Sequence, residues 1–600
     1  MRSIIRYKSI FFLFLAVLVF SCEKKPDDNY IDTDATKLIL NLDGIVSPEF
    51  EEVEINSAQD DKRTLASIKD FHIESALEIF KSSKQEISKS SFRSDVTIPG
   101  EYPPASTRTP IDNGVKYRVI VIDTETEKVI FNQIFTVGNK SNAVVIGRPS
   151  PSIVSRQYRV IAYSYNTTSE DDLTASWNNN LVIDLPNDKE FLYFNRKYTI
   201  FFQDDGIVTN TNLTFIQQTS KFGVVLDPRS TNGKVKAVAG NVGRISAGVF
   251  VPKVIVGTGT INLKNTEIIA TGTKELDVPI SYTGNADTLG VYAYSVQQKI
   301  DNFAVRLSQL SVDVPKSNAN FGETTMITKS VIADAEKVIS FAGFTNMEKG
   351  IQVNARIYLF NGFEVNETGS QNYTLWSYGN LYYDASAADN RFKYKIRNYA
   401  FEGKDSQGHS YLYTDYWRPS NDLYLVPNPT TAQLSNNDFK GDPCGQVYPK
   451  GAWHTPTMAE AELLLQSNHA KSGISHVYNH NNYGTARFVE YVNQKSSPLR
   501  FYGHGYYNLH YAIAPHLVAA FMLSSFTSGA TIYTKDPRAL VYTISEDINE
   551  SIEVDDGQDD PIGPVLKKKY NGANTDAITN YDDDIATPRF NIRCVRSVKK

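Results

Sequence analysis

Long apolar stretches, catalytic motifs and an excess of basic charge are all missing from this chain of 600 residues. Its net charge of −6 at pH 7 gives no basic stripe of the kind that binds nucleic acid, so we expect no nucleic-acid partner. After residue 20 no apolar run is long enough for a transmembrane helix. The sequence contains no His-Glu-x-x-His, no Gly-x-Ser-x-Gly and no Walker loop, so the enzyme classes that those motifs define are not expected.

The first 22 residues are typical of a secretory signal. Basic residues near the amino terminus precede an unbroken apolar run over residues 10–20, and the small residue Ser21 stands before Cys22. Because the apolar run is too short to span a bilayer, we interpret it as a leader that is removed.

Residues 19–22 (Val-Phe-Ser-Cys) resemble the lipobox of bacterial lipoproteins, with Val19 where Leu is usual. The resemblance implies that residues 1–22 are a lipoprotein signal region and that Cys22 is lipidated, which would anchor the exported chain to the outer membrane. Each buried CH₂ of an acyl chain contributes about 0.8 kcal/mol, so several chains anchor stably. Residues 23–35 would then be a tether. An ordinary signal with a chance cysteine is the alternative.

Only three cysteines are present, Cys22, Cys444 and Cys594. If Cys22 carries lipid, the other two are the one pair left. An exported chain meets an oxidising compartment, where that pair can form a disulfide. The bond would close a loop of about 150 residues, for which the chain-entropy model gives roughly 5 kcal/mol as an upper figure. Two free buried thiols are the alternative.

Aromatic and β-branched residues are plentiful, and the chain has 35 Tyr and 31 Phe but only 5 Met. Such residues suit the pleated, half-buried surface of a sheet. Alternation of apolar and polar residues predicts strands over residues 36–42, 115–122, 129–137 and 157–165. Short strands, frequent turns and the lack of long helical patterns predict a mainly β protein built from sandwiches.

The last third of the chain has its own composition, with seven of the nine histidines between His454 and His516. Residues 457–460 (Thr-Met-Ala-Glu) form a capping box that predicts a helix over residues 459–466. His476 and His480 have the spacing of a metal pair on a helix, but the surrounding Asn and Gly residues favour a loop and no third ligand completes a set. We therefore expect no metal and no cofactor.

Four segments, taken in order, resemble the fimbrillin-like proteins of Bacteroidales. A strand ending in an acidic turn and a Tyr-Ser-Tyr-Asn strand resemble the amino-terminal half of those proteins, and two later segments resemble the start and the closing strand of their second half. The segments are residues 117–123, 158–166, 213–227 and 344–359. The resemblance implies two tandem β-sandwiches, over residues 36–212 and 213–371.

A second ordered set of segments resembles the bacterial C-type-lectin-like modules related to the formylglycine-generating-enzyme fold. The set comprises residues 376–383, 442–444, 453–460, 499–506 and 590–596. The resemblance implies an α+β module over residues 372–600, with Cys444 near the first helix and Cys594 on the last strand, positions that suit a disulfide. Residues 521–525 depart from the pattern, because they read Phe-Met-Leu-Ser-Ser where Tyr-Trp-Ser-Ser is frequent.

The fimbrillin-like families are understood to polymerise by strand addition, after a protease removes the first strand of each subunit. On that analogy the strand containing Leu38, Leu40 and Leu42 is the removable one, and its leucines fill the pockets of the groove. Arg63, within a dibasic pair in a polar loop, is the candidate site of maturation. An uncut surface pair is the alternative for Arg63.

A disulfide-closed module at the carboxyl end suits a tip or accessory subunit better than a stalk subunit. The expected function is therefore an exported, lipidated fimbrial tip or accessory protein, with a lipid anchor before maturation. Its expected partners are other fimbrial subunits and a host or bacterial surface protein or glycan, which Tyr502, Tyr506 and Tyr507 would contact.

Two other functions stay open at this point. The first is a non-polymerising surface lipoprotein that binds glycans. The second is an enzyme of the formylglycine-generating type, which would need free reactive cysteines. Because both cysteines stand at framework positions, we expect no enzyme activity.

Overall fold

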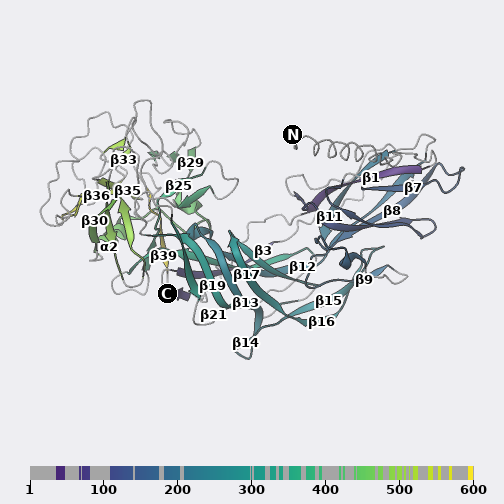
Figure 1. Cartoon of the computed structure of the whole chain (residues 1–600), viewed down its shortest axis with the longest axis horizontal. Helices are drawn as coiled ribbons and strands as arrows, with labels where there is room; N and C mark the ends of the chain where they lie inside the picture. Colours follow the sequence, from purple (N-terminus) through teal and green to yellow (C-terminus); the bar gives the residue numbers. More distant parts are fainter. Residues whose placement is uncertain are drawn as a thin grey trace, which may run out of the picture.

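The computed structural model comprises three parts in sequence order (Figure 1). A first β-sandwich lies at one end of the molecule, a second sandwich lies in the middle, and a C-terminal part lies at the other end. The structure describes residues 35–46, 66–68, 71–80, 108–139, 142–174, 181–202, 208–296, 299–300, 303–317, 325–332, 337–341, 350–366, 373–384, 391–394, 418–420, 423–425, 438–440, 442–466, 470–476, 485–493, 496–502, 506–507, 512–513, 518–523, 538–544, 552–555, 567–569 and 592–598.

The first sandwich is one sheet that folds over on itself, with the strand order β4-β1-β11-β10-β8-β5-β6 and with β7 beside β1. Its strands are β1 (Ala35–Val46), β4 (Arg108–Thr109), β5 (Lys116–Asp123), β6 (Val129–Thr136), β7 (Ala143–Gly147), β8 (Ser155–Ser164), β10 (Leu192–Phe201) and β11 (Val208–Gln217). The fold falls between β10 and β11, which pair only at Leu192–Gln217 and Tyr193–Ile216. The two halves enclose one apolar core. The strands expected from apolar alternation are confirmed as β1, β5, β6 and β8.

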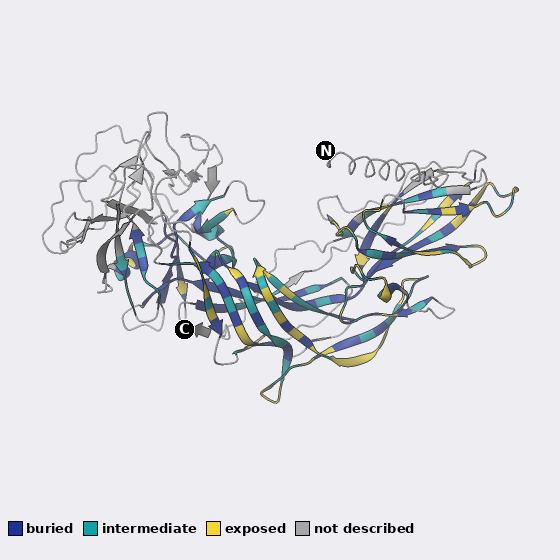
Figure 2. Cartoon of the chain, in the orientation of Figure 1, coloured by how far each residue is buried: buried dark blue, intermediate teal, exposed yellow. Residues whose placement is uncertain are grey.

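The second sandwich pairs two sheets across a larger apolar core. One sheet has the order β18-β12-β22-β3-β2, and the other has the order β14-β13-β19-β20 with β17 beside β13 and β21 beside β19. The strands of the first of these sheets are β2 (Ala66–Ile68), β3 (Phe71–Phe80), β12 (Ser220–Asp227), β18 (Leu289–Ser295) and β22 (Gln352–Asn361). Those of the second are β13 (Lys234–Ser246), β14 (Val249–Val251), β17 (Val278–Ala286), β19 (Phe303–Pro315), β20 (Met326–Ile332) and β21 (Lys337–Ser340). Figure 2 shows buried residues along the strands of both sandwiches.

A small sheet joins the two sandwiches. β9 (Val182–Asp184), which lies between β8 and β10 in the sequence, pairs with β15 (Val254–Asn262), and β15 pairs with β16 (Ile268–Leu276). Apolar residues of this sheet and of the outer face of β5, β8 and β10 form one cluster. Asn187 is buried, and its amide nitrogen donates to the carbonyl oxygens of Gly257 (2.9 Å) and Tyr294 (2.8 Å). The sandwiches are therefore packed against each other rather than strung on a linker.

The division of the chain between the sandwiches differs from the expected ranges 36–212 and 213–371. β2 and β3 pair into the second sandwich although they precede most of the first, and β11 completes the first sandwich as far as Gln217. The apolar Phe71 and Ile73 of β3 enter the core of the second sandwich. Apolar residues of β3 alternate with polar ones, but this local pattern does not indicate which sandwich the strand joins.

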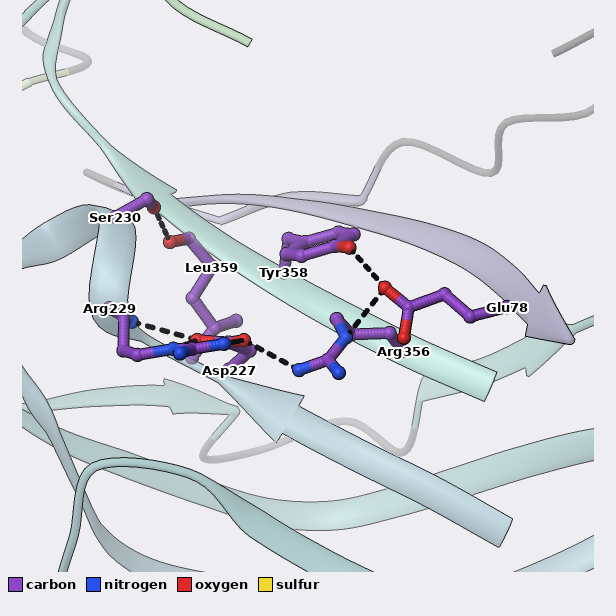
Figure 3. Close-up of polar contacts among 7 residues, drawn as sticks. All are labelled: Glu78, Asp227, Arg229, Ser230, Arg356, Tyr358 and Leu359. Atoms are coloured by element: carbon purple, nitrogen blue, oxygen red, sulfur yellow. Dashed lines mark hydrogen bonds and ion pairs between the residues drawn. The ribbon is translucent and has the colours of Figure 1, made fainter. Parts of the chain in front are cut away.

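A buried ion-pair network fixes β3 to the middle of the second sandwich (Figure 3). Arg356 of β22 donates through Nε to Glu78 of β3 (2.8 Å) and through Nη1 to Asp227 of β12 (2.8 Å). Asp227 is fully buried and also accepts from Arg229 (Nη2–Oδ2, 2.7 Å), while Tyr358 donates to Glu78 (2.8 Å). Burial opposes the charge on Arg356, but the two carboxylates outweigh it and raise its pKa.

The C-terminal part continues directly from β22. β23 (Phe363–Asn366) pairs with β24 (Tyr373–Trp376), and β24 pairs with β39 (Val595–Val598), the last strand described. Among its described residues, α2 (Met458–Gln466) is a helix and η4 (Cys444–Gln446) is a short 3-10 turn. Two other 3-10 turns, η2 (Asp171–Thr174) and η3 (Arg229–Thr231), lie in the sandwich regions of the chain. The other strands are β25 (Leu381–Tyr383), β26 (Phe392–Tyr394), β27 (Arg418–Ser420), β28 (Leu423–Leu425), β29 (Asp438–Lys440), β30 (Ala470–His476), β31 (Thr485–Tyr491), β32 (Leu499–Tyr502), β33 (Tyr506–Tyr507), β34 (Ala512–Ile513), β35 (Val518–Leu523), β36 (Arg538–Ile544), β37 (Ile552–Asp555) and β38 (Lys567–Lys569).

Replacement of Arg356 by Met is expected to lower the free energy of unfolding of the second sandwich by about 3–5 kcal/mol. The substitution removes the counter-charge of Glu78 and one of the two counter-charges of the buried Asp227. Urea unfolding of the purified chain measures the loss. Lys234→Met is the matched control. Lys234 and its partner Asp287 are mostly exposed, so their pair contributes at most about 1 kcal/mol. If the two substitutions lowered the free energy of unfolding equally, the proposed contribution of Arg356 to the stability of the second sandwich would be contradicted.

Candidate functional site in the first sandwich

The first strand in the sequence, β1, occupies an interior position in its sheet. On one side it pairs in parallel with β11, from Lys37–Val208 to Ile45–Phe215. On the other side it pairs antiparallel with β7, from Ala35–Gly147 to Ile39–Ala143. The other strand pairings described in this sandwich are antiparallel. Removal of β1 would therefore separate β7 from β11 and open a gap in the sheet.

The leucines of β1 are part of the core of the first sandwich. Leu38 is 1% exposed and Leu40 is 5% exposed, and Leu42 packs against the same cluster from a half-buried position. Asn41, which alternates with them, is exposed. Full burial of a leucine side chain contributes about 1.5–3 kcal/mol, so these residues account for much of the hold on β1. The alternation expected from the sequence is the one that the structure has.

A bulge ends the regular part of β1. The register with β11 shifts between Leu42 and Gly44, and Gly44 is buried with a φ of 116°. Side chains other than hydrogen rarely adopt this left-handed region, which favours glycine at the position.

On the side of β1 that faces β7, Asn142 is engaged in hydrogen bonds. Asn142 donates through Nδ2 to the hydroxyl oxygen of Tyr117 (3.0 Å) and to the carbonyl oxygen of Thr136 (2.7 Å). Its own carbonyl oxygen accepts from the backbone nitrogen of Leu40 (3.4 Å). Burial raises the pKa of Tyr117 to about 12, so its hydroxyl is neutral at physiological pH and takes part only as a hydrogen-bonding group.

The connection after β1 leaves the first sandwich. The next described strands, β2 and β3, belong to the second sandwich, and the chain returns to the first only at β4. Arg63, the candidate site of maturation, lies in the sequence between β1 and β2 and is outside the described residues, as is Cys22. A cut at Arg63 would leave β1 attached to the first sandwich by non-covalent contacts alone.

The two remaining cysteines, Cys444 and Cys594, are joined by a disulfide, with their Cα atoms 5.6 Å apart. Cys444 begins η4 shortly before α2, and Cys594 directly precedes β39. Both side chains are fully buried. The bond ties the 3-10 turn before α2 to the segment that leads directly into β39.

Next to the disulfide, the capping box expected at the start of α2 is confirmed. The Thr457 backbone nitrogen donates a hydrogen bond to the Glu460 carboxylate (2.8 Å), and the Glu460 backbone nitrogen donates one to the Thr457 hydroxyl (3.3 Å). His454 Nε2 lies 2.9 Å from the same carboxylate. Burial lowers the pKa of His454, but the hydrogen bond and charge of Glu460 outweigh burial and raise it. Burial raises the pKa of Glu460, but the hydrogen bond and charge of His454 outweigh burial and lower this pKa.

The tyrosines proposed for ligand contact do not join the site at β1. Tyr502 ends β32, and Tyr506 and Tyr507 form β33, which pairs with β34. Figure 1 places β33 at the opposite end of the molecule from β1. His476 is the last residue of strand β30, so it does not belong to a helix, and His480 lies outside the described residues.

Contacts that the sequence patterns did not indicate hold the C-terminal part to the second sandwich. His72 Nδ1 of β3 lies 2.6 Å from the hydroxyl of Tyr373, and Glu74 of β3 forms an ion pair with Arg596 of β39. The Arg596 guanidinium also lies 3.9 Å from the ring centre of Phe360. Only long-range pairing brings these residues together, so no local signal could have found them.

Within the described residues, no helix has the length and apolarity that crossing a bilayer requires. The same part of the chain contains no group of three or more His, Cys, Asp or Glu side chains placed to hold a metal ion.

Comparison with known proteins gives partial likenesses to solved structures alone. No family model matches the sequence. No curated protein matches it. The similar structures include a candidate cell adhesion protein from Bacteroides thetaiotaomicron (11% identity, 54% of this chain and 91% of that chain, TM-score 0.22). They also include the fimbrial anchor protein Mfa2 from Porphyromonas gingivalis (12%, 33% and 71%, TM-score 0.20) and a fimbrial assembly protein from Parabacteroides distasonis (12%, 44% and 87%, TM-score 0.21). At such TM-scores these likenesses carry no argument about function.

Leu40→Ala is expected to destabilise the first sandwich by about 2–5 kcal/mol, because it removes buried methyl groups and leaves a cavity beside β11. Amide hydrogen exchange of β8 measures the effect locally. Asn41→Ala, on the exposed face of the same strand, is expected to change stability by no more than about 0.5 kcal/mol. If Leu40→Ala left exchange in β8 unchanged, the leucine would not contribute to this core.

The charge pair of His454 and Glu460 gives a pH-dependent stability. The contribution of His454 is fully present below its ordinary pKa of 6.5 and is lost as pH rises through its raised value. The contribution of Glu460 is present above its ordinary pKa of 4.5 and is lost as pH falls through its lowered value.

The native chain should therefore exceed His454→Gln in free energy of unfolding by a larger amount between pH 4.5 and 6.5 than at mildly alkaline pH. The expected difference is about 1 kcal/mol for a pair in which His454 is partly exposed and Glu460 is buried. Thermal unfolding across pH measures it, with Lys450→Gln on the exposed neighbouring loop as the control. If the difference in stability between the native chain and His454→Gln did not vary with pH, a charged pair of His454 and Glu460 would be ruled out.

Proposed function

We propose that this chain is a cell-surface fimbrial subunit that accepts a strand from a neighbouring subunit. In this proposal Cys22 is lipidated and holds the exported chain at the outer membrane. A protease then cuts after Arg63, and β1 leaves the first sandwich. A strand of another fimbrial subunit takes its place between β7 and β11, where backbone hydrogen bonds supply affinity and side-chain pockets supply specificity.

The position of β1 is the observation that carries this proposal. β1 supplies Leu38 and Leu40 to the core, yet the strands that follow it belong to the other sandwich. Its departure would leave the rest of the chain connected and would expose two unpaired strand edges beside an apolar groove. Such a groove recognises an extended apolar strand, since an unpaired edge is a template for pairing with another chain.

The C-terminal part supports a tip or accessory position. β39 is paired with β24, and the adjacent disulfide holds it in place, so this strand is engaged within its own part of the molecule. We place residues 372–600 as a C-type-lectin-like adhesive module, with Tyr502, Tyr506 and Tyr507 as its contacts to a host or bacterial surface protein or glycan. An enzyme of the formylglycine-generating type is disfavoured, because the disulfide consumes both cysteines that its chemistry would need.

A strand-exchange assay on the processed chain tests the proposal. The chain from residue 23 is nicked with trypsin at Arg63 and mixed with a labelled peptide of residues 35–46. We expect the label to enter the protein as the fragment ending at Arg63 leaves, both followed by size-exclusion chromatography. A peptide carrying Leu38→Asp and Leu40→Asp is the control and should not enter, because burial of two charges is too costly.

Amino-terminal sequencing of surface material provides the second readout of the same prediction. A subunit that exchanges strands is expected to begin at Thr64, and the variant Lys62→Ala/Arg63→Ala should keep its original amino terminus and fail to assemble. Surface protein that retains Cys22 and β1 in its working form would instead favour a non-polymerising lipoprotein that binds glycans.

A further inference from the structure

Thr211 of β11 presents a buried hydroxyl beside the candidate removable strand. It pairs laterally with Leu40 and is 3% exposed. Among the residues that the structure describes, none forms a hydrogen bond with its hydroxyl oxygen. Side chains two positions apart on a strand share a face, so Thr211 points to the same side as Leu213 and Phe215, which lie in the apolar core. A polar group therefore sits in that core with nothing to bond.

A second hydroxyl on the same strand is also left without a partner. Thr214 is 4% exposed, its hydroxyl oxygen has no hydrogen bond, and it pairs laterally with Gly44 of β1. Gly44 has no side chain and so cannot reach it. Along β11, the neighbour of Thr211 in β1 is a leucine and the neighbour of Thr214 is a glycine, so neither can supply a bond through a side chain.

Buried polar groups in folded proteins are normally hydrogen-bonded, and each exception calls for an explanation. Thr231 of this chain follows the rule, since its hydroxyl is buried and donates to the carbonyl oxygen of Pro228 (2.7 Å). With β1 seated, both hydroxyls of Thr211 and Thr214 are buried without a hydrogen bond, so any water that they would bind in its absence is lost. This loss weakens the hold on β1 without disturbing its apolar contacts.

We propose that β1 is a placeholder with an incomplete fit, and that the strand which replaces it comes from a partner subunit and carries a hydroxyl or amide side chain opposite Thr211. This inference rests on the strand exchange proposed above. Hydroxyl pairs between neighbouring strands form cross-strand hydrogen bonds. A side chain of Ser, Thr or Asn at the position of Leu40 would satisfy Thr211. The unpaired hydroxyls would then favour exchange over retention of β1.

A comparison of two peptides of nearly equal shape tests the specificity. Peptides of residues 35–46 carrying Leu40→Thr or Leu40→Val differ at one group, a hydroxyl against a methyl. Binding of each labelled peptide to the nicked chain is measured by competition. The threonine peptide is expected to bind about fivefold more tightly, the size of one hydrogen bond that rescues a buried group. In the variant Thr211→Val the preference is expected to reverse, which closes a double-mutant cycle.

Release of the native strand provides the second measurement. Thr211→Val removes the unpaired hydroxyl and keeps the shape, so the fragment ending at Arg63 should leave the nicked chain about fivefold more slowly. Thr231→Val, which removes a bonded hydroxyl outside the groove, should not slow release and should lower the unfolding temperature.

The outcomes separate the two proposals. If the native peptide enters the nicked chain but the valine peptide binds as tightly as the threonine peptide or more so, the placeholder inference is overturned and strand exchange stands. An unchanged or faster release of the fragment from Thr211→Val overturns the inference in the same way. If no peptide enters, both proposals fall together.

Discussion

The ion pairs of Arg356 are the interaction on which the rest of the structure depends. Arg356 bridges Glu78 on β3 and Asp227 on β12, and the partners Arg356 and Glu78 lie 278 positions apart in the sequence. Because this network fixes β3 in the second sandwich, the segment that follows β1 is anchored away from the first. If β1 left the first sandwich as proposed, β2 and β3 would therefore stay bound to the second sandwich.

The same strand also carries the contacts to the C-terminal part. On β3, His72 meets Tyr373 and Glu74 meets Arg596, while Arg229 of the network lies 3.7 Å from the ring centre of Tyr448. Burial raises the pKa of Tyr448 to about 12, so the ring stays neutral beneath the guanidinium. β3 therefore contacts both β22 of the second sandwich and the C-terminal part. Through Arg229 and Tyr448, the ion-pair network of Arg356 also reaches the C-terminal part.

Local sequence signals predicted what depends on near neighbours. The alternation of Leu38, Leu40 and Leu42, the capping box of Thr457 and Glu460, and the mainly β composition all match the structure, because each depends on residues a few positions apart. The membership of β3 in the second sandwich and the network of Arg356 could not be predicted, since the partners of β3 lie hundreds of positions away in the sequence. At the candidate site, alternation identified the leucines, whereas the unpaired hydroxyls of Thr211 and Thr214 became visible only from the register with β1.

The pairing of β24 with β39 has a consequence for biogenesis. The carbonyl oxygen of Ser377, just after β24, accepts a bond from Arg593, 216 positions later, so this sheet cannot close until β39 has been synthesised. Contacts between such distant positions make folding slow relative to local structure. A polypeptide that folds slowly stays unfolded for longer after synthesis, which would suit the export proposed for this chain.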